Sequence, residues 1–251
     1  MAEYIIEEGT GLFPDGMIVN KRGDNDVTSL IISKSVTTIN TEPLYKLRYL
    51  DKIVVSGENA VFDSRCNCNA IIETASNTLI KGCHNTIIPD SIKTVGNEAF
   101  FCCSQIKKIK IPDSVTVIGE FAFSSCRELL EINIPDSVTS IGMGAFHHCY
   151  SLSRIVLPRN LTEIRHGLFT RCKSLTSIVI PESVKLIDLD AFRWCENLNE
   201  VHLLGSETTF YENPFKGCIN LKHIYVPIDV VDIYRENVDP SLQTLIEQFE
   251  Q

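Results

Sequence analysis

Basic residues and long apolar runs are scarce in this sequence, and each scarcity excludes a class of protein. The 251 residues hold 23 Lys and Arg against 32 Asp and Glu, which gives a net charge of −9. This balance disfavours a general nucleic-acid binder or a protein that attaches to anionic membranes, because both normally carry the opposite charge. No apolar run approaches the roughly 18 residues of a membrane-spanning helix, so we expect no direct membrane insertion.

The chain also lacks an export signal at its start and the motifs of common catalytic classes. Met1-Ala2-Glu3-Tyr4 is not a basic segment leading into an apolar one. The location expected from the chain as it stands is therefore cytoplasmic, unless an export signal has been removed. No Walker loop, G-x-G-x-x-G after a strand, H-E-x-x-H or G-x-S-x-G occurs, and the six histidines are scattered. We therefore predict no catalytic residue, no cofactor and no enzyme activity.

Three residue types recur with a period of 23 residues over most of the chain. The phenylalanines are Phe100, Phe123, Phe146, Phe169, Phe192 and Phe215. The cysteines are Cys103, Cys126, Cys149, Cys172, Cys195 and Cys218, and the prolines are Pro89, Pro112, Pro135, Pro158 and Pro181. Fixed periods between about 20 and 50 residues are typical of solenoids, in which stacked units share one core.

One unit, from Pro135 to Leu157, shows how each coil is built. Its end, Leu152-x-x-Ile155-x-Leu157, alternates as a short strand, and the proline that follows ends the strand because it cannot donate to a ladder. Residues 138–141 predict a second short extended piece, and the Gly-x-x-Ala-Phe-x-x-Cys segment predicts a turn or a brief helix. The fold class is therefore an α/β solenoid of stacked coils.

The repeat extends over residues 33–226, and its ends depart from the pattern. Between residues 56 and 88 the unit is longer, and the extra segment predicts an inserted β-hairpin near residues 60–82. Residues 1–32 are expected to form an N-terminal cap. Residues 227–251 lose the repeat and show helical patterns at 230–237 and 242–249, which predict a helical C-terminal cap.

The unit L-x-x-I-x-I-P-x-S-V-T-x-I-G-x-x-A-F-x-x-C resembles the BspA-like (Treponema pallidum-type) leucine-rich repeat over roughly residues 28–227. The segment 62–80 and the ending Ile224-Tyr225-Val226-Pro227 before a short helix are also similar to such proteins from gut and oral Bacteroidetes. The resemblance implies a curved stack with the parallel sheet on its concave face. It also implies an adhesion or host-interaction protein, exposed at the cell surface or secreted, without catalytic residues.

Ten cysteines raise the question of disulfides or metal binding. The six of the repeat occupy the position that Leu47 fills in the first unit, so we interpret them as reduced core residues, with disulfides between coils as the alternative. Cys102 is either a reactive thiol or an incidental cysteine. Cys66-Asn67-Cys68 offers two ligands, whereas structural zinc needs four, so no metal site is predicted.

The outward face of the sheet is the most informative surface, because side chains alternate along a strand and two columns face outward. The first column reads Lys108, Glu131, Arg154, Ser177, Glu200 and His223, and the second reads Lys110, Asn133, Val156, Val179, His202 and Tyr225. A solvated ladder of mixed charge is the simpler interpretation of the first column. Apolar and aromatic groups on an outward face favour a protein contact. The candidate partner-binding residues are Arg154, Val156, Val179, Glu200, His202, His223 and Tyr225.

Three functions compete on this basis. The first is a non-catalytic interaction module, adhesin-like or host-binding, that presents its sheet face to a protein or glycan partner. The second is a structural or spacer element of a larger cell-surface protein. The third is an enzyme, for which the sequence offers no nucleophile, base or cofactor loop. We expect the interaction module, with no nucleic-acid partner.

Overall fold

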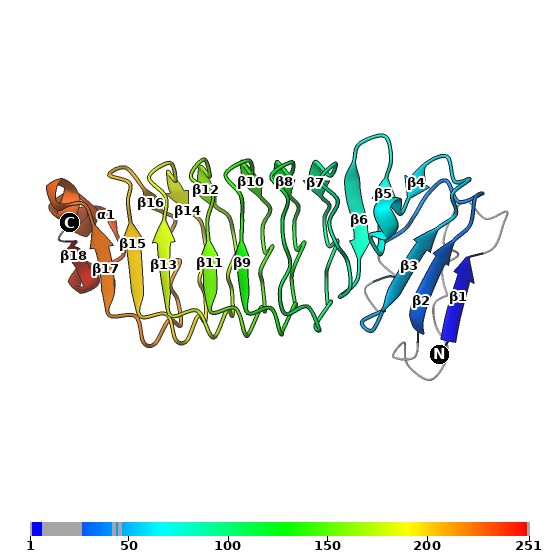
Figure 1. The fold of residues 1–251 in the computed structure, drawn as a ribbon. Helices are drawn as coiled ribbons and strands as arrows, with labels where there is room; N and C mark the ends of the chain where they lie inside the picture. Colours follow the sequence, from blue (N-terminus) through cyan, green and yellow to red (C-terminus); the bar gives the residue numbers. More distant parts are fainter. Residues whose placement is uncertain (1, 7–26, 42–43, 45–46, 250–251) are drawn as a thin grey trace.

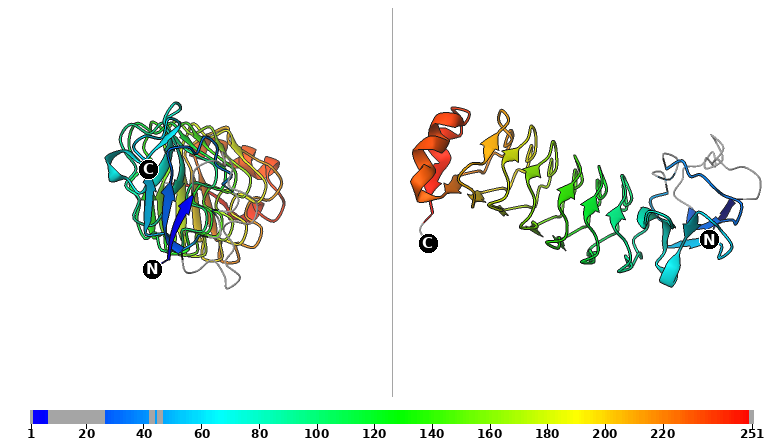
Figure 2. Two further views of the ribbon diagram at one scale, coloured as in Figure 1. Left: turned by 90° about the vertical axis from the view of Figure 1, so that its right-hand side faces the viewer. Right: turned by 90° about the horizontal axis from the view of Figure 1, so that it is seen from above.

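The computed structural model describes residues 2–6, 27–41, 44 and 47–249, which form a single row of stacked coils (Figure 1). The longer strands lie side by side on one side of the row and run parallel. They are β9 (Glu131–Asn133), β11 (Arg154–Val156), β13 (Ser177–Ile180), β15 (Glu200–Leu203) and β17 (His223–Val226). Seen from above, the row follows a gently bent path (Figure 2). The predicted solenoid with a parallel sheet is confirmed.

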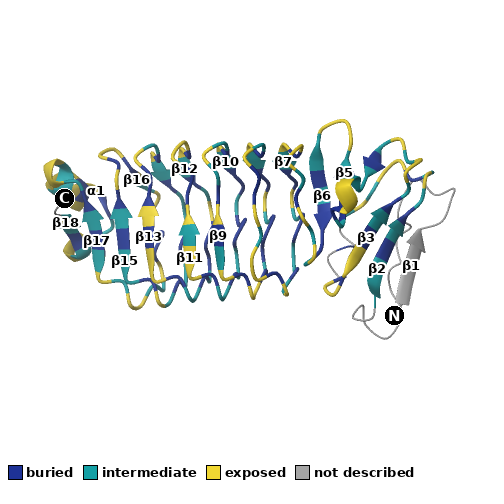
Figure 3. Cartoon of the chain, in the orientation of Figure 1, coloured by how far each residue is buried: buried dark blue, intermediate teal, exposed yellow. Residues whose placement is uncertain are grey.

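The strands pair in the register that the repeat predicts. Arg154 lies beside Glu131, Val179 lies beside His202, and His202 in turn lies beside Tyr225. Parallel strands are about 4.8 Å apart, so residues at the same repeat position form straight columns along the row. Within a strand, buried and exposed residues alternate, as at β13 and β15 (Figure 3).

A second row of two-residue strands runs along the coils and corresponds to the second extended piece of each unit. It comprises β7 (Thr94–Val95), β8 (Val117–Ile118), β10 (Ser140–Ile141), β12 (Glu163–Ile164), β14 (Leu186–Ile187) and β16 (Thr209–Phe210). The first three belong to one sheet and the last three to another. Within each of these two sheets, the ladders hold neighbouring coils together on a second side.

The Gly-x-x-Ala-Phe-x-x-Cys segment forms consecutive turns, and no helix occurs over residues 85–226. The Phe123 amide donates to the Ala145 carbonyl of the next coil at 2.9 Å, and the Ser125 amide donates to the His147 carbonyl at 2.7 Å. Two positions per coil have a left-handed backbone. At the first, φ is between 51° and 62° at Glu98, Phe121, Gly144, Gly167 and Asp190, and at the second it is between 57° and 63° at Cys102, Ser125, His148, Arg171 and Trp194. The amides of this segment therefore bridge coils instead of closing a helix.

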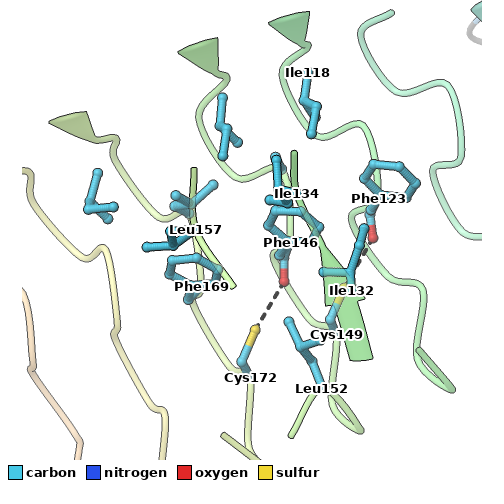
Figure 4. Packing of buried hydrophobic residues seen from close by; sticks show 14 of the residues in the cluster. Ile118, Phe123, Ile132, Ile134, Phe146, Cys149, Leu152, Leu157, Phe169 and Cys172 are labelled. Carbon is cyan, nitrogen blue, oxygen red and sulfur yellow. Dashed lines mark hydrogen bonds between the residues drawn. The ribbon is translucent and has the colours of Figure 1, made fainter. Parts of the chain in front are cut away.

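Six phenylalanines stack through the core. The ring centroids of successive phenylalanines, from Phe100 to Phe215, are 5.1 to 5.8 Å apart, and their planes lie within 20° of each other. Each of these side chains is 3% exposed or less. Leucine, isoleucine and valine side chains from both rows of strands surround the stack (Figure 4). The 23-residue period thus places one aromatic ring of each coil on top of the next.

The repeat cysteines are free thiols that also donate hydrogen bonds, which packing arguments alone did not anticipate. Cys149 Sγ donates to the Phe123 carbonyl oxygen and Cys172 Sγ to the Phe146 carbonyl oxygen, both at 3.2 Å (Figure 4). The same bond recurs at Cys126, Cys195 and Cys218. Burial raises the pKa of Cys149 to about 12, so the group remains a neutral thiol and a hydrogen-bond donor.

Residues 56–88 contain an antiparallel insertion. β5 (Ala70–Glu73) pairs with β6 (Thr78–Gly82), and β4 (Phe62–Asp63) pairs with β5, with a short 3-10 turn at Arg65–Asn67 between them. β6 also pairs in parallel with β7. The insertion is therefore continuous with the row of short strands that follows it.

At the N-terminal end, β1 (Ala2–Ile6), β2 (Val27–Ile32) and β3 (Lys52–Val55) form a parallel sheet of three strands. Leu30 lies beside Ile53, which is the register of the repeat. β2 therefore stacks on β3 as one repeat strand stacks on the next. The expected cap at 1–32 also includes residues 7–26, which lie outside the described residues.

The C-terminal end departs from the expectation of two helical segments. After a 3-10 turn at Ile228–Val230, α1 (Val231–Asn237) occupies the first, but the second forms a 3-10 turn at Gln243–Leu245 followed by β18 (Ile246–Gln248). The prediction of a helix at 242–249 is wrong because β18 adds to the edge of β17, where Ile246 lies beside Ile224 and is fully buried. Among the described residues, no helix has the length and apolarity to cross a membrane.

Candidate functional site

The sheet face is the outward surface of β9, β11, β13, β15 and β17, together with the residue columns that continue it. Inward residues such as Ile178 and Ile180 are buried, which turns Ser177 and Val179 outward. All seven candidate residues are on this face. Arg154, Val156 and Val179 are exposed, and Glu200, His202, His223 and Tyr225 are half-buried.

The centre of the sheet face is apolar. Val156 is 48% exposed and Val179 is 52% exposed, although valine side chains in strands are normally buried. Ile87, one repeat before Lys110 in the same column, is 76% exposed. Ile87 is not among the candidates predicted from the sequence, because it lies in the longer unit 56–88, before the first regular unit. Three uncovered aliphatic side chains therefore share one outward column.

The C-terminal end of the face combines aromatic rings with carboxylates. The Tyr225 ring lies 4.8 Å from the His202 ring and 5.5 Å from the His223 ring, measured between centroids. His202 Nε2 is 3.5 Å from Glu200 Oε2, and His223 Nδ1 is 3.2 Å from Glu247 Oε2. Desolvation, followed by the charges of Glu200 and Glu247, raises the pKa of Tyr225, so its hydroxyl stays a hydrogen-bond donor.

Glu247 is a site residue that the sequence did not reveal. It belongs to β18, where it lies beside Tyr225. The helix that the sequence pattern predicts over residues 242–249 would not bring the Glu247 side chain to the sheet face. The available signal was that Ile246 follows Ile224 by nearly one repeat, which is compatible with one more strand.

The N-terminal end of the face holds three cations, Lys108, Lys110 and Arg154, together with the carboxylates of Asp113 and Glu131. Lys108 Nζ lies 2.6 Å from Glu131 Oε1, and this pair lowers the pKa of Glu131. Lys110, Arg154 and Val156 line the same shallow hollow, which has a volume of about 530 Å³. The face therefore changes from cationic groups, through exposed valines, to aromatic rings with carboxylates.

Within the described part of the chain, no group of three or more His, Cys, Asp or Glu side chains is placed to hold a metal ion. Cys66 is exposed while Cys68 is buried, so the two thiols do not face one space. The chemistry that the sheet face supports is recognition through shape, apolar contact and charge.

The family model described as "BspA type Leucine rich repeat region" matches the chain in six copies, over residues 71–199 and 126–238. No curated protein matches the chain significantly. Among solved structures, a leucine-rich repeat protein from Eubacterium ventriosum is 28% identical, with a TM-score of 0.74, over 82% of this chain and 57% of that one. A leucine-rich cell surface protein from Faecalibacterium prausnitzii is 30% identical, with a TM-score of 0.59, over 79% of this chain and 47% of that one.

A leucine-rich repeat protein from Treponema pallidum is 27% identical, with a TM-score of 0.56, and the match covers 67% of this chain and 93% of that one. The chain spans only about half the length of the Eubacterium and Faecalibacterium proteins. The family model covers well over half of the chain, and the stacked coils agree with it. The chain belongs to the BspA-type leucine-rich repeat family.

Proposed function

We propose that this chain is a non-catalytic interaction module that binds a partner protein through its sheet face, in the manner of an adhesin or host-binding protein. The observation that carries the proposal is the pair of exposed valines, Val156 on β11 and Val179 on β13, at the centre of the sheet face. Apolar groups at the centre of an outward face, with polar groups around them, are typical of a protein interface.

The stacked backbone lowers the cost of binding. Each coil is fixed to its neighbours by backbone ladders and by the phenylalanine stack, so the sheet face is already ordered before a partner arrives. A pre-organised surface loses little conformational entropy on association. Tyr225, flanked by two histidine rings, adds an aromatic group of the kind that dominates interface energetics.

The charge distribution defines the partner further. Lys108, Lys110 and Arg154 at one end would face acidic groups of the partner, and Glu200 and Glu247 at the other end would face basic groups. The partner surface would therefore be apolar at its centre and oppositely charged at its two ends. A cell-surface location is part of the proposal and is supported by the Faecalibacterium relative, which is described as a cell surface protein.

Site-specific photo-crosslinking in the producing cells tests the proposal. A photoreactive phenylalanine analogue replaces Val179 on the sheet face or, in a matched control, Ile219, which is 79% exposed and lies off the sheet. We expect a discrete protein adduct from position 179 that is absent from position 219. The adduct from position 179 should disappear when Val156→Asp is added.

Two results would contradict the proposal. One is the same set of adducts from both positions, and the other is an adduct at position 179 that survives Val156→Asp. A complete lack of adducts from the sheet face would favour the structural or spacer role instead.

A further inference from the structure

A second surface, on the turns of the central coils, concentrates cations that the sheet face does not use. We call it the cation ridge and define it by Arg127, His147, His148, Tyr150, Arg171 and Trp194. Three of these residues, His148, Arg171 and Trp194, occupy the second left-handed position of successive coils. Arg127 and Tyr150 occupy another turn position, two residues further along the repeat. Neighbouring coils are about 4.8 Å apart, so the ridge extends over three coil steps, about 14 Å along the row.

Aromatic rings hold the guanidinium groups of the ridge in place. Arg171 Cζ lies 4.3 Å from the centre of the Trp194 ring, and Arg127 Cζ lies 5.6 Å from the centre of the Tyr150 ring. Arg193 Cζ lies 4.2 Å from the same tryptophan ring. Stacking occupies the face of a guanidinium and leaves its N–H edge available, which is the edge that binds oxyanions.

The two central arginines lack a carboxylate partner, in contrast to their neighbours. Lys173 pairs with Glu196 at 2.8 Å, and Arg193 pairs with Asp190 at 2.9 Å. Within the described ranges, no ion pair involves Arg127 or Arg171. Like charges that are not paired with carboxylates repel one another. The ridge therefore carries uncompensated positive charge on a protein whose net charge is −9.

Burial and the nearby positive charges lower the pKa values of His147 and His148, which lie between these arginines in the sequence. Desolvation, followed by the charges of His148, Arg171 and His166, lowers the pKa of His147 to about 4. Desolvation, Arg171 and Arg127 lower the pKa of His148. The two Nδ1 atoms are 3.0 Å apart, so a neutral pair shares one hydrogen bond in which one ring donates and the other accepts. An anion at the ridge would offset the part of these shifts that the arginine charges cause, and so would raise both pKa values.

We propose that the cation ridge binds a compact oxyanion of sulfate or phosphate chemistry, free or as a terminal ester, beside His148, in the coil between those of Arg127 and Arg171. Such an anion accepts charge-assisted hydrogen bonds from a free guanidinium edge and offsets the positive charge that Arg127 and Arg171 concentrate. A long polyanion such as nucleic acid is disfavoured because the net charge of −9 would repel the portions that extend beyond the ridge. This site is separate from the sheet face and does not depend on the function proposed for it.

Histidine ring NMR provides a direct test with inorganic sulfate as the probe, in buffers whose ionic strength is matched with chloride. We expect sulfate to move the ring resonances of His147 and His148 and to raise the apparent pKa of His148. His202 and His223 on the sheet face serve as internal controls and should not move. Equal shifts of all histidines, or no shift at the ridge, would overturn the proposal.

Matched variants localise the effect. The double variant Arg127→Gln/Arg171→Gln should abolish the sulfate-dependent shift and weaken sulfate binding by about tenfold or more, the scale of charged hydrogen bonds. The control Arg159→Gln/Lys185→Gln also removes two cations, but cations that have carboxylate partners, and should bind sulfate as the wild type does. Persistence of binding in the first double variant would refute the site.

If the double variant does not fold, the single variant Arg127→Gln replaces it. Arg127 is exposed and stacks on Tyr150, so its substitution should leave the core intact. It should weaken sulfate binding in the same direction, and unchanged binding would count against the site. A sulfated disaccharide then distinguishes the sources of the anion. Tighter binding than inorganic sulfate identifies an ester, and equal binding identifies the free ion.

Discussion

Removing one ring from the phenylalanine stack measures how strongly the coils are coupled. Phe146 is fully buried, and its ring centroid lies 5.6 Å from that of Phe123 and 5.8 Å from that of Phe169. Phe146→Ala removes the apolar transfer energy and leaves a cavity, which together cost about 3–5 kcal/mol in protein cores. Two lost ring pairs add about 0.5–1.5 kcal/mol each. We expect a loss of about 4–8 kcal/mol in the free energy of unfolding.

Phe146→Leu separates the two contributions. Leu44 fills the same position of the first unit and is fully buried, so the fold accepts leucine there. This variant keeps most of the apolar volume and loses mainly the ring pairs, so we expect a loss of about 1–3 kcal/mol. The loss for Phe146→Leu therefore measures mainly ring stacking, and the difference between the losses for Phe146→Ala and Phe146→Leu measures mainly packing volume.

Urea unfolding followed by far-ultraviolet circular dichroism is the assay. In a stacked-repeat protein, weakening a central interface can also split the cooperative unit, which would appear as a lower dependence of the unfolding free energy on urea. A loss below about 1 kcal/mol for Phe146→Ala, at an unchanged urea dependence, would refute the view that this stack holds the coils together.

Three further predictions concern side chains outside the phenylalanine stack. Brief treatment of the native protein with iodoacetamide at pH 8 should label exposed Cys66 and half-buried Cys102. Cys149 should react only after unfolding, because burial raises its pKa to about 12. Mass spectrometry identifies the labelled cysteines, and early labelling of Cys149 would contradict its burial. Trp194→Ala should cost about 1–2 kcal/mol in chemical denaturation, because two stacked guanidinium groups lose their ring, and a cost near zero would mean that the stacks contribute nothing. His147 has a folded-state pKa of about 4, below its ordinary 6.5, so the unfolded chain takes up the proton first and stability falls as pH drops from 6.5 towards 4. His147→Gln should reduce this acid-side loss in thermal melts at pH 7 and pH 4.5, and an identical pH dependence in both proteins would contradict the assignment.

The sequence was sufficient for the coil, its register and its core, because each depends on a strict period. Once Phe123 and Phe146 are one unit apart, stacking is the only way to bury both, and the inward and outward residues of each strand follow from alternation. The outward positions of Val156 and Val179 could therefore be predicted residue by residue. Their exposure depends only on the strand in which they lie.

Features that depend on a partner elsewhere in the chain could not be predicted in this way. The apolar spacing of Leu242 and Ile246 fits a helix, and only the unfilled edge of β17 makes the segment a strand that brings Glu247 beside Tyr225. The thiol of Cys149 matches leucine in packing, but its bond to the Phe123 carbonyl needs the three-dimensional position of that oxygen. Trp194 stands in a variable column, and its two arginine stacks come from different coils.

The same period that makes the core uniform leaves the outward positions free to differ from coil to coil. Substitutions at Val156 or Val179 change neither the phenylalanine stack nor the thiol–carbonyl bonds, since those groups lie on the inward side of each coil. The cation ridge is equally independent, because Arg127 and Arg171 contact rings of the next coil instead of the sheet face. A loss of partner binding without a change in stability, or of sulfate binding without loss of partner binding, is therefore an interpretable result in this architecture.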